Sequence, residues 1–259
     1  VRFGKSETLK SSTCYVSPSG EKIQTRENVR DLGVIMSENL RFDEHISTIV
    51  NKGTQLCGWI LRTFKTRSQE TMMLLFKQLV RNSLEYCCPL WSPNEEFLKK
   101  KIEKVQRTFT RRIKGLSGTD RPSYWDRLQL LNIYSLERRR ERYMILYTVK
   151  ALTGLVPNPG FVVHQNKRTG LHLVVPWSRS ISGIATEKMK DRSILVQGPK
   201  LFNILPKDLR MEYENISIES FKHRLDEFLR TIPDQPTVAG LGRAADSNSI
   251  IDQIKTLHQ

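Results

Sequence analysis

The sequence lacks long apolar runs, a disulfide framework and a secretion signal. Its apolar runs are only a handful of residues long, whereas a membrane-spanning helix needs about 20, and the first residues contain no apolar signal-peptide core. The four cysteines stand in no pair with the C-x-x-C spacing typical of zinc sites. We therefore expect an intracellular chain, in the nucleus or the cytoplasm, that makes no contact with a membrane.

Residues that would carry out catalysis are also scarce. The five histidines are scattered through the sequence, and none has the spacing of a metal-binding H-E-x-x-H pair. Asp43 and Glu44 are adjacent acids near a strand end, but their position favours capping of a helix over binding of a metal. Because no carboxylate cluster exists, an independent nuclease is disfavoured. The sequence predicts a binding protein with no cofactor and no small-molecule substrate.

Positive charge is what the sequence has in excess. Lys and Arg total 42 against 27 Asp and Glu, a formal net charge of +15. Residues 50–150 hold 21 of the basic and nine of the acidic side chains, so most of the excess lies in the middle of the chain. A concentrated block of this kind favours contact with the phosphates of a nucleic acid. The alternative is a helical region whose solvated faces happen to use Lys and Arg.

Hydrophobic spacing predicts a mainly α chain with a small β portion. Short apolar runs around turn residues predict a hairpin over 14–24 and a strand over 32–36. From Phe42 onward the period becomes helical. The predicted helices are 42–64, 68 to before Pro89, 95–116, 125–131 and 135–154.

The C-terminal part is predicted to mix both types of element. Residues 161–163 and 171–175 are strand-like, and helices are expected over 197–205 and from Ser217 to before Pro233. The last residues, 234–259, are polar and predict a loosely ordered tail. Three serines are expected to cap the N-termini of their helices, namely Ser68, Ser135 and Ser217.

The predicted helix over 95–116 has two opposed faces. On a helical wheel of about 100° per residue, the apolar side chains share one sector: Leu98, Ile102, Val105, Phe109, Ile113 and Leu116. The basic side chains lie opposite: Lys100, Lys104, Arg107, Arg111 and Lys114. Glu103 is the only acid between Phe97 and Leu116, and like charges at i,i+4 repel unless an anion compensates them. The pattern predicts a row of phosphate contacts without base readout; a solvated outer face is the alternative.

Further basic residues surround this row. Arg62, Lys65 and Arg67 lie in the turn between the first two predicted helices, and we expect them to extend the nucleic-acid site. The run 137–142 contains four arginines, partly neutralised by two glutamates. Aromatic residues for base stacking are few in this region, so the expected contacts are to backbone and shape.

Three groups of sequence phrases follow one another along the chain. The first joins V-R-F-G-K at 1–5, V-R-D-L-G-V at 29–34 and L-R-F-D-E-H-I at 40–46. The second joins L-V-R-N-S-L-E-Y at 79–86, W-S-P at 91–93 and I-E-K-V-Q-R at 102–107. The third joins G-P-K-L-F-N-I-L-P at 198–206 and S-F-K at 220–222. Together they resemble the reverse transcriptase polyproteins of non-LTR retrotransposons, specifically of jockey-like elements.

The resemblance implies the C-terminal part of an RNA-directed DNA polymerase. Residues 1–41 would end the palm, 42–156 would form a basic helical thumb, 157–233 would form a mixed α+β post-thumb region, and 234–259 would be a flexible tail. By the same analogy, Leu32, Gly33 and Val34 would form the primer grip, which positions the primer 3′ end. The basic row of the thumb would follow the backbone of the template–primer duplex, whose A-form is recognised through shape and phosphates.

The catalytic aspartates of that family lie upstream of the strand that 1–4 resembles, and this sequence does not contain them. Because the chain begins at Val1 and not at Met, we expect a fragment that is inactive alone, with Mg bound by the missing palm. The expected partners are RNA, an RNA–DNA hybrid or DNA, and the upstream palm and fingers of the same polyprotein. The alternative is a helical protein-interaction module, a domesticated or relic transposon fragment, that binds an acidic protein through 138–142.

Overall fold

Helices dominate the architecture of the chain. The computed structural model describes residues 14–24, 26–166, 170–176, 191–236 and 247–257. Within these ranges the elements are helices and two small two-stranded antiparallel sheets, which confirms the predicted mainly α fold with a small β portion. Residues 1–4, which resemble a palm strand, lie outside the described residues.

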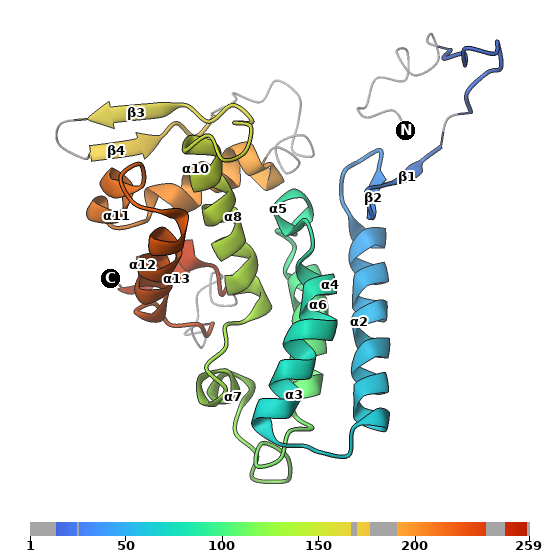
Figure 1. Ribbon diagram of the computed structural model, residues 1–259, viewed down its shortest axis with the longest axis vertical. Coiled ribbons are helices and arrows are strands. Elements are labelled where there is room, and N and C mark those ends of the chain that lie inside the picture. Colours follow the sequence, from blue (N-terminus) through green and yellow to red (C-terminus); the bar gives the residue numbers. More distant parts are fainter. Residues whose placement is uncertain (1–13, 25, 167–169, 177–190, 237–246, 258–259) are drawn as a thin grey trace.

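The elements divide into two groups along the chain (Figure 1). The first comprises β1 (Asn28–Asp31), β2 (Val34–Ser37), α2 (Asp43–Thr63), α3 (Gln69–Leu75), the π-helical segment η1 (Phe76–Arg81), α4 (Asn82–Glu85), α5 (Cys88–Trp91) and α6 (Glu96–Thr110). The second comprises α7 (Tyr124–Leu130), α8 (Leu136–Leu152), β3 (Val163–Asn166), β4 (Gly170–Leu173), α10 (Ile194–Asn203), α11 (Lys207–Glu212), α12 (Ile218–Arg230) and α13 (Ile250–Leu257).

Serine caps begin three of the helices, as the sequence predicts. The side chains of Ser68, Ser135 and Ser217 each accept a hydrogen bond from the backbone N–H three residues later, at the start of α3, α8 and α12. Each cap satisfies one of the N–H groups that a helix N-terminus leaves free.

The start of α2 differs from the expected acidic cap. Phe42 occupies the N-cap position in the left-handed conformation, with φ 60°, and no side chain caps the helix there. Asp43 lies in the first turn, and its Oδ2 is 2.9 Å from Nε of Arg41. Its negative charge still lies at the positive end of the helix dipole.

The N-terminal β structure is smaller than predicted. Residues 14–24 contain a single antiparallel bridge, Val16 to Lys22, around the turn at 17–20. The run 32–36 is not one strand, because Leu32 and Gly33 have φ 44° and 88° and form the two-residue turn between β1 and β2. Positive φ at both central residues is what a tight hairpin requires. The strand β1, before this turn, was missed.

Two hydrophobic cores meet along α8. The first core lies among α2, α3, η1, α5 and α6, and Leu136 at the start of α8 belongs to it. The second core takes Met144, Ile145 and Val149 from the later turns of α8 and closes with α10, α11, α12 and α13. Figure 1 shows α8 between the helices of the first group and α12. The change of core therefore falls within α8, ahead of the boundary expected at 156–157.

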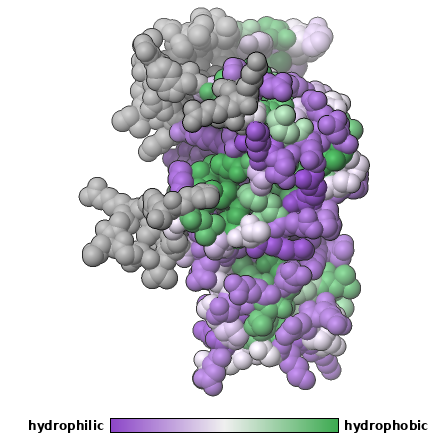
Figure 2. Space-filling model, turned by 90° about the vertical axis from the view of Figure 1, so that its left-hand side faces the viewer, coloured by the Kyte–Doolittle hydropathy of each residue, from purple (hydrophilic) through white to green (hydrophobic). Residues whose placement is uncertain are grey.

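The C-terminal part contains more structure than predicted. Asn203 at the end of α10 holds β4 through two hydrogen bonds, because its Oδ1 accepts from Leu173 N at 2.7 Å and its Nδ2 donates to Leu173 O at 2.8 Å. The expected tail is wrong for 250–257, which form α13 with Ile250 buried in the second core. On the side of Figure 1 that carries α12 and α13, hydrophilic residues cover most of the surface, with hydrophobic patches between them (Figure 2).

No helix in the described ranges combines the length and the apolar character that crossing a bilayer requires.

Candidate nucleic-acid interface

Helix α6 separates apolar and basic side chains onto opposite faces. Leu98, Ile102 and Phe109 are at most 1% exposed and lie in the first core. On the opposite side Lys104 and Arg111 are exposed, and so is Lys100. The predicted opposition of the two faces is therefore present over the length of α6.

Glu103, the one acid within the basic row, turns away from that row. It is 7% exposed, and its carboxylate accepts hydrogen bonds from Leu136 N at 3.1 Å, from Glu137 N at 3.3 Å and from the Tyr124 hydroxyl. Burial raises the pKa of Glu103 to about 7, although the Tyr124 hydrogen bond and the charge of Arg140 lower it. Glu103 thus satisfies N–H groups at the start of α8, whereas the other acid of α6, Glu96 in its first turn, pairs with Lys99 at 2.9 Å.

The basic row continues beyond the end of α6 in a turn. The predicted helix over 95–116 ends at Thr110, and the left-handed Gly115, with φ 81°, marks the turns that follow. Ile113 and Leu116 remain buried, so the apolar face continues without the helix. Lys114 is exposed, and its backbone N–H donates to Arg67 O at 2.8 Å.

Arg107 has a different environment from its neighbours in the row. Its guanidinium carbon is 4.8 Å from the centroid of the Tyr124 ring and 5.9 Å from that of Trp125, and the side chain is half-buried. A cation over an aromatic face is held electrostatically. Arg107 therefore links α6 to α7, and its guanidinium is less accessible to a phosphate than those of its exposed neighbours.

The last turn of α2, which holds Arg62, and the turn after it, which holds Lys65 and Arg67, bring three more cations to the same end of the molecule. Arg62 and Lys65 are exposed. Arg67 instead donates to the backbone carbonyl oxygens of Leu61 and Phe64, and to Thr66 O at 3.3 Å. These bonds fix the turn, so Arg67 stabilises the fold in addition to adding charge.

Four arginines surround a hollow at the junction of these segments. Its volume is about 790 Å³, and we call it the arginine hollow. The residues that line it are Arg67, Arg111, Arg112, Arg121, Leu61, Thr108, Ser117 and Gly118. None of them is acidic. Sequence reasoning missed Arg112 and Arg121, because Arg112 falls outside the basic sector of the predicted helix and Arg121 lies in a loop without periodicity.

The expected primer-grip residues lie in the β1–β2 hairpin, next to Tyr86 of the motif at 79–86. Leu32 is 84% exposed at the turn, whereas Val34 is 2% exposed. The Tyr86 hydroxyl donates to Leu32 O at 3.0 Å, and a Cβ added at Gly33 would lie 3.6 Å from the Tyr86 ring. The predicted role of this turn stays a prediction, but its position is fixed by contacts to the helices.

His45 anchors the same hairpin from α2. Its Nδ1 accepts from Ile35 N at 3.3 Å, and its ring meets Trp91 edge to face with centroids 5.4 Å apart. The Trp91 indole donates in turn to Tyr86 O at 2.7 Å. Burial lowers the pKa of His45, and the charge of Arg30 lowers it further. Because its Nδ1 accepts the Ile35 N–H, the imidazole acts as a structural hydrogen-bond acceptor.

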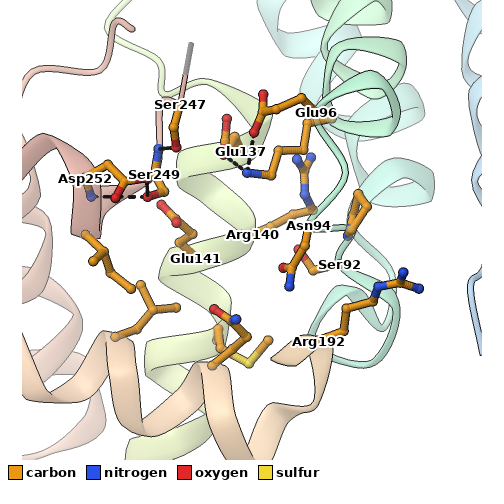
Figure 3. Close-up of a pocket in the computed structure, with 16 residues that line it drawn as sticks. Ser92, Asn94, Glu96, Glu137, Arg140, Glu141, Arg192, Ser247, Ser249 and Asp252 are labelled. Carbon is orange, nitrogen blue, oxygen red and sulfur yellow. Dashed lines mark hydrogen bonds and ion pairs between the residues drawn. The ribbon is translucent and has the colours of Figure 1, made fainter. Parts of the chain in front are cut away.

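A second hollow, between the two cores, has mixed charge (Figure 3). It has a volume of about 310 Å³. Its basic lining residues are Lys99, Arg140 and Arg192, and its acidic ones are Glu96, Glu137, Glu141 and Asp252. Lys99 Nζ lies 2.9 Å from Glu96 and 2.8 Å from Glu137. Because acids outnumber bases here, this hollow is a poorer phosphate site than the arginine hollow. Among the residues with described positions, no group of three or more His, Cys, Asp and Glu is arranged to hold a metal ion.

Known proteins offer limited similarity to this chain. It is 29% identical over 119 residues to a Caenorhabditis elegans protein named "Uncharacterized protein B0403.1". The matched segment is 46% of this chain and 60% of that relative, so the chain spans less than two thirds of the relative's length. No family model matches the sequence, and no solved structure matches it.

Proposed function

We propose that this chain binds the sugar-phosphate backbone of RNA or of an RNA–DNA hybrid through the exposed cations of the basic row, chiefly Lys104 on α6 and Arg111 and Lys114 in the turn that follows it. The observation that carries the proposal is the basic row, where Lys104 on α6 and Arg111 directly after it are exposed while Glu103 is buried against α7 and the start of α8. Repulsion within such a row is relieved when phosphates approach it.

The resemblance to reverse transcriptases supplies the wider setting for this proposal. In that setting the chain holds the template–primer duplex as a thumb, and the upstream palm of the same polyprotein carries the aspartates and the Mg. The Leu32–Val34 turn would lie at the primer end. Synthesis by this chain alone is not expected, because its sequence lacks those aspartates.

An acidic protein partner for the arginines of α8 is less well supported. Arg138 is fully buried and donates to backbone carbonyls. Arg139 pairs with Glu85, and Arg142 pairs with Asp226 at 2.6 Å. These groups are already bound within the chain.

Binding of a labelled RNA–DNA hybrid, measured by fluorescence anisotropy over a range of salt concentrations, tests the proposal. With three to five exposed cations engaged, log affinity should fall with log salt at a slope of about −3 to −4. Lys104→Glu with Arg111→Glu should weaken binding by about 10- to 100-fold, at unchanged helix content in circular dichroism.

A matched control is Lys222→Glu with Lys255→Glu, which makes the same change in net charge on α12 and α13. Equal loss of affinity in both double variants would indicate a nonspecific effect of net charge and would exclude the α6 face as the site. A DNA duplex and an acidic peptide are measured in the same assay, so that their affinities can be compared with that of the RNA–DNA hybrid.

A further inference from the structure

The arginine hollow differs from the basic row in shape and in charge density. The row presents cations one after another along a helix face, whereas the hollow gathers Arg67, Arg111, Arg112 and Arg121 around one concave space. The hydroxyl-bearing residues Thr108 and Ser117 also line it. A single small ligand in the hollow would therefore face several guanidinium groups at once.

The charges of the hollow are not neutralised by the chain itself. Arg111, Arg112 and Arg121 are exposed, and within the described ranges none of them forms an ion pair. Arg67 donates to carbonyl oxygens, which satisfy its hydrogen bonds but leave its positive charge in place. Four positive charges thus surround the space, and no carboxylate lines it.

The positive charges around the hollow also act on a neighbouring buried arginine, Arg127. Arg127 is 2% exposed and donates to Thr110 Oγ1 at 3.2 Å and to Pro122 O at 3.0 Å. Burial lowers the pKa of Arg127, and the charges of Arg111, Arg121 and Arg107 lower it further. The local field is therefore strongly positive, and an anion in the hollow would relieve it.

The amount of charge distinguishes two phosphate ligands. A phosphodiester within a strand carries one negative charge, whereas a terminal phosphate monoester carries about −1.5 to −2 at neutral pH and three acceptor oxygens. Arginine forks bind such oxygens in pairs. We infer that the arginine hollow binds the terminal phosphate of a nucleic-acid strand, an inference that rests on the proposed function.

The test compares strands that differ only at their ends. Three versions of one oligonucleotide carry a 5′-phosphate, a 3′-phosphate or hydroxyls at both ends, and their affinities for the full chain are measured at fixed salt. Either the strand with the 5′-phosphate or the strand with the 3′-phosphate should bind about 10-fold more tightly than the strand with hydroxyls at both ends. Arg112→Gln with Arg121→Gln should abolish this preference while the affinity for the hydroxyl strand changes by less than about 3-fold.

The control variant removes the same charge from the helix face. Lys100→Gln with Lys104→Gln should weaken binding of all three strands by a similar factor and preserve their ratio. Equal affinity of the unaltered chain for the three strands would overturn the inference and leave the proposed function standing. No binding of any strand would overturn both. Inorganic phosphate that binds as tightly as the phosphorylated strand would identify a free-phosphate site and would also overturn the inference.

Discussion

Helices α6 and α8 are both rich in basic residues, but they use positive charge in opposite ways. Lys104 on α6 and Arg111 directly after the helix are exposed, and the acid within the basic row, Glu103, is turned into the core. Charge is therefore concentrated on the outside of this helix, where it is available to a ligand.

On α8 the arginines are internal. Arg138 and Arg140 are 0% and 2% exposed, and the half-buried Arg139 and Arg142 pair with acids from other elements. The comparison teaches that a count of charges along a sequence does not separate a binding surface from a structural network. Whether an acid or a carbonyl from a distant segment meets each cation decides between the two.

Arginine 138 should give the largest effect in this comparison. It donates to Leu229 O at 3.4 Å, Ile232 O at 3.3 Å and Pro233 O at 2.7 Å. In Arg138→Met the carbonyl oxygens of Ile232 and Pro233 lose this donor, while Leu229 O keeps the backbone N–H of Ile232 at 3.3 Å. We expect a loss of about 3 kcal/mol in the free energy of unfolding. Urea denaturation followed by circular dichroism measures it.

The matched control for this change is Arg140→Met. All three guanidinium nitrogens of Arg140 are buried and have no hydrogen-bond partner among the described residues. Arg140 interacts with Glu103 through its charge but makes no hydrogen bond. Replacing such a buried charge by an apolar side chain is expected to leave stability unchanged or to raise it by about 1 kcal/mol. An equal loss in both variants would show that position in the core, and not the hydrogen bonds of Arg138, sets the cost.

The buried Glu103 of α6 should make the free energy of unfolding depend on pH, with an effect of intermediate size. Burial raises the pKa of Glu103 to about 7 in the folded chain, above the value of about 4.3 in an unfolded chain. Between these two pKa values the folded chain keeps a proton on Glu103 that the unfolded chain has lost. The proton stabilises the folded state at low pH, and this stabilisation is lost as the pH rises through about 7. Between pH 5 and pH 8 we expect a loss of about 2 kcal/mol in the free energy of unfolding.

Glu103→Gln isolates that contribution. The variant cannot titrate, so its stability should change less between pH 5 and pH 8 than that of the unaltered chain. Burial also raises the pKa of Glu141, to about 8. The loss of stability with rising pH that comes from Glu141 therefore remains in the variant. Parallel pH profiles for the two proteins would contradict the buried environment of Glu103.

The exposed row of α6 should give the smallest effect, and with the opposite sign. Lys104→Gln with Arg111→Gln removes repulsion between neighbouring cations, and we expect a gain of about 0.5 kcal/mol at low salt. The gain should vanish near 1 M salt, where the Debye length is about 3 Å. Lys222→Gln on α12, which loses a contact of 3.7 Å to Glu219, should show no gain. A gain that persists at high salt would mean that repulsion is not its cause.

Local signals in the sequence were enough for most helices and for one face of the candidate site. The apolar period and the serine caps predicted α8 and α12, and the wheel of α6 placed its basic and apolar faces correctly. Such features depend on residues three or four apart, which a single sequence displays directly.

The remaining features depend on distant partners or on unusual backbone. Arg142 meets Asp226 from 84 residues away, and the carbonyls that bind Arg138 lie more than 90 residues from it, so no spacing rule indicates either contact. The apolar character of Leu32 predicted a strand, but its left-handed backbone and exposure place it at the tip of a turn. The short helix α13 was missed because 234–259 are mostly polar, although Ile250 reaches the second core.

The continuity of α8 has a consequence for how the chain unfolds. The helix spans 17 residues, a rod of about 25 Å at 1.5 Å per residue, and its first turn belongs to one core while its later turns belong to the other. Loss of either core leaves part of the rod without its packing, and an isolated helix of this length is marginally stable in water. The two halves therefore act as one cooperative unit, and heat should melt them in a single transition.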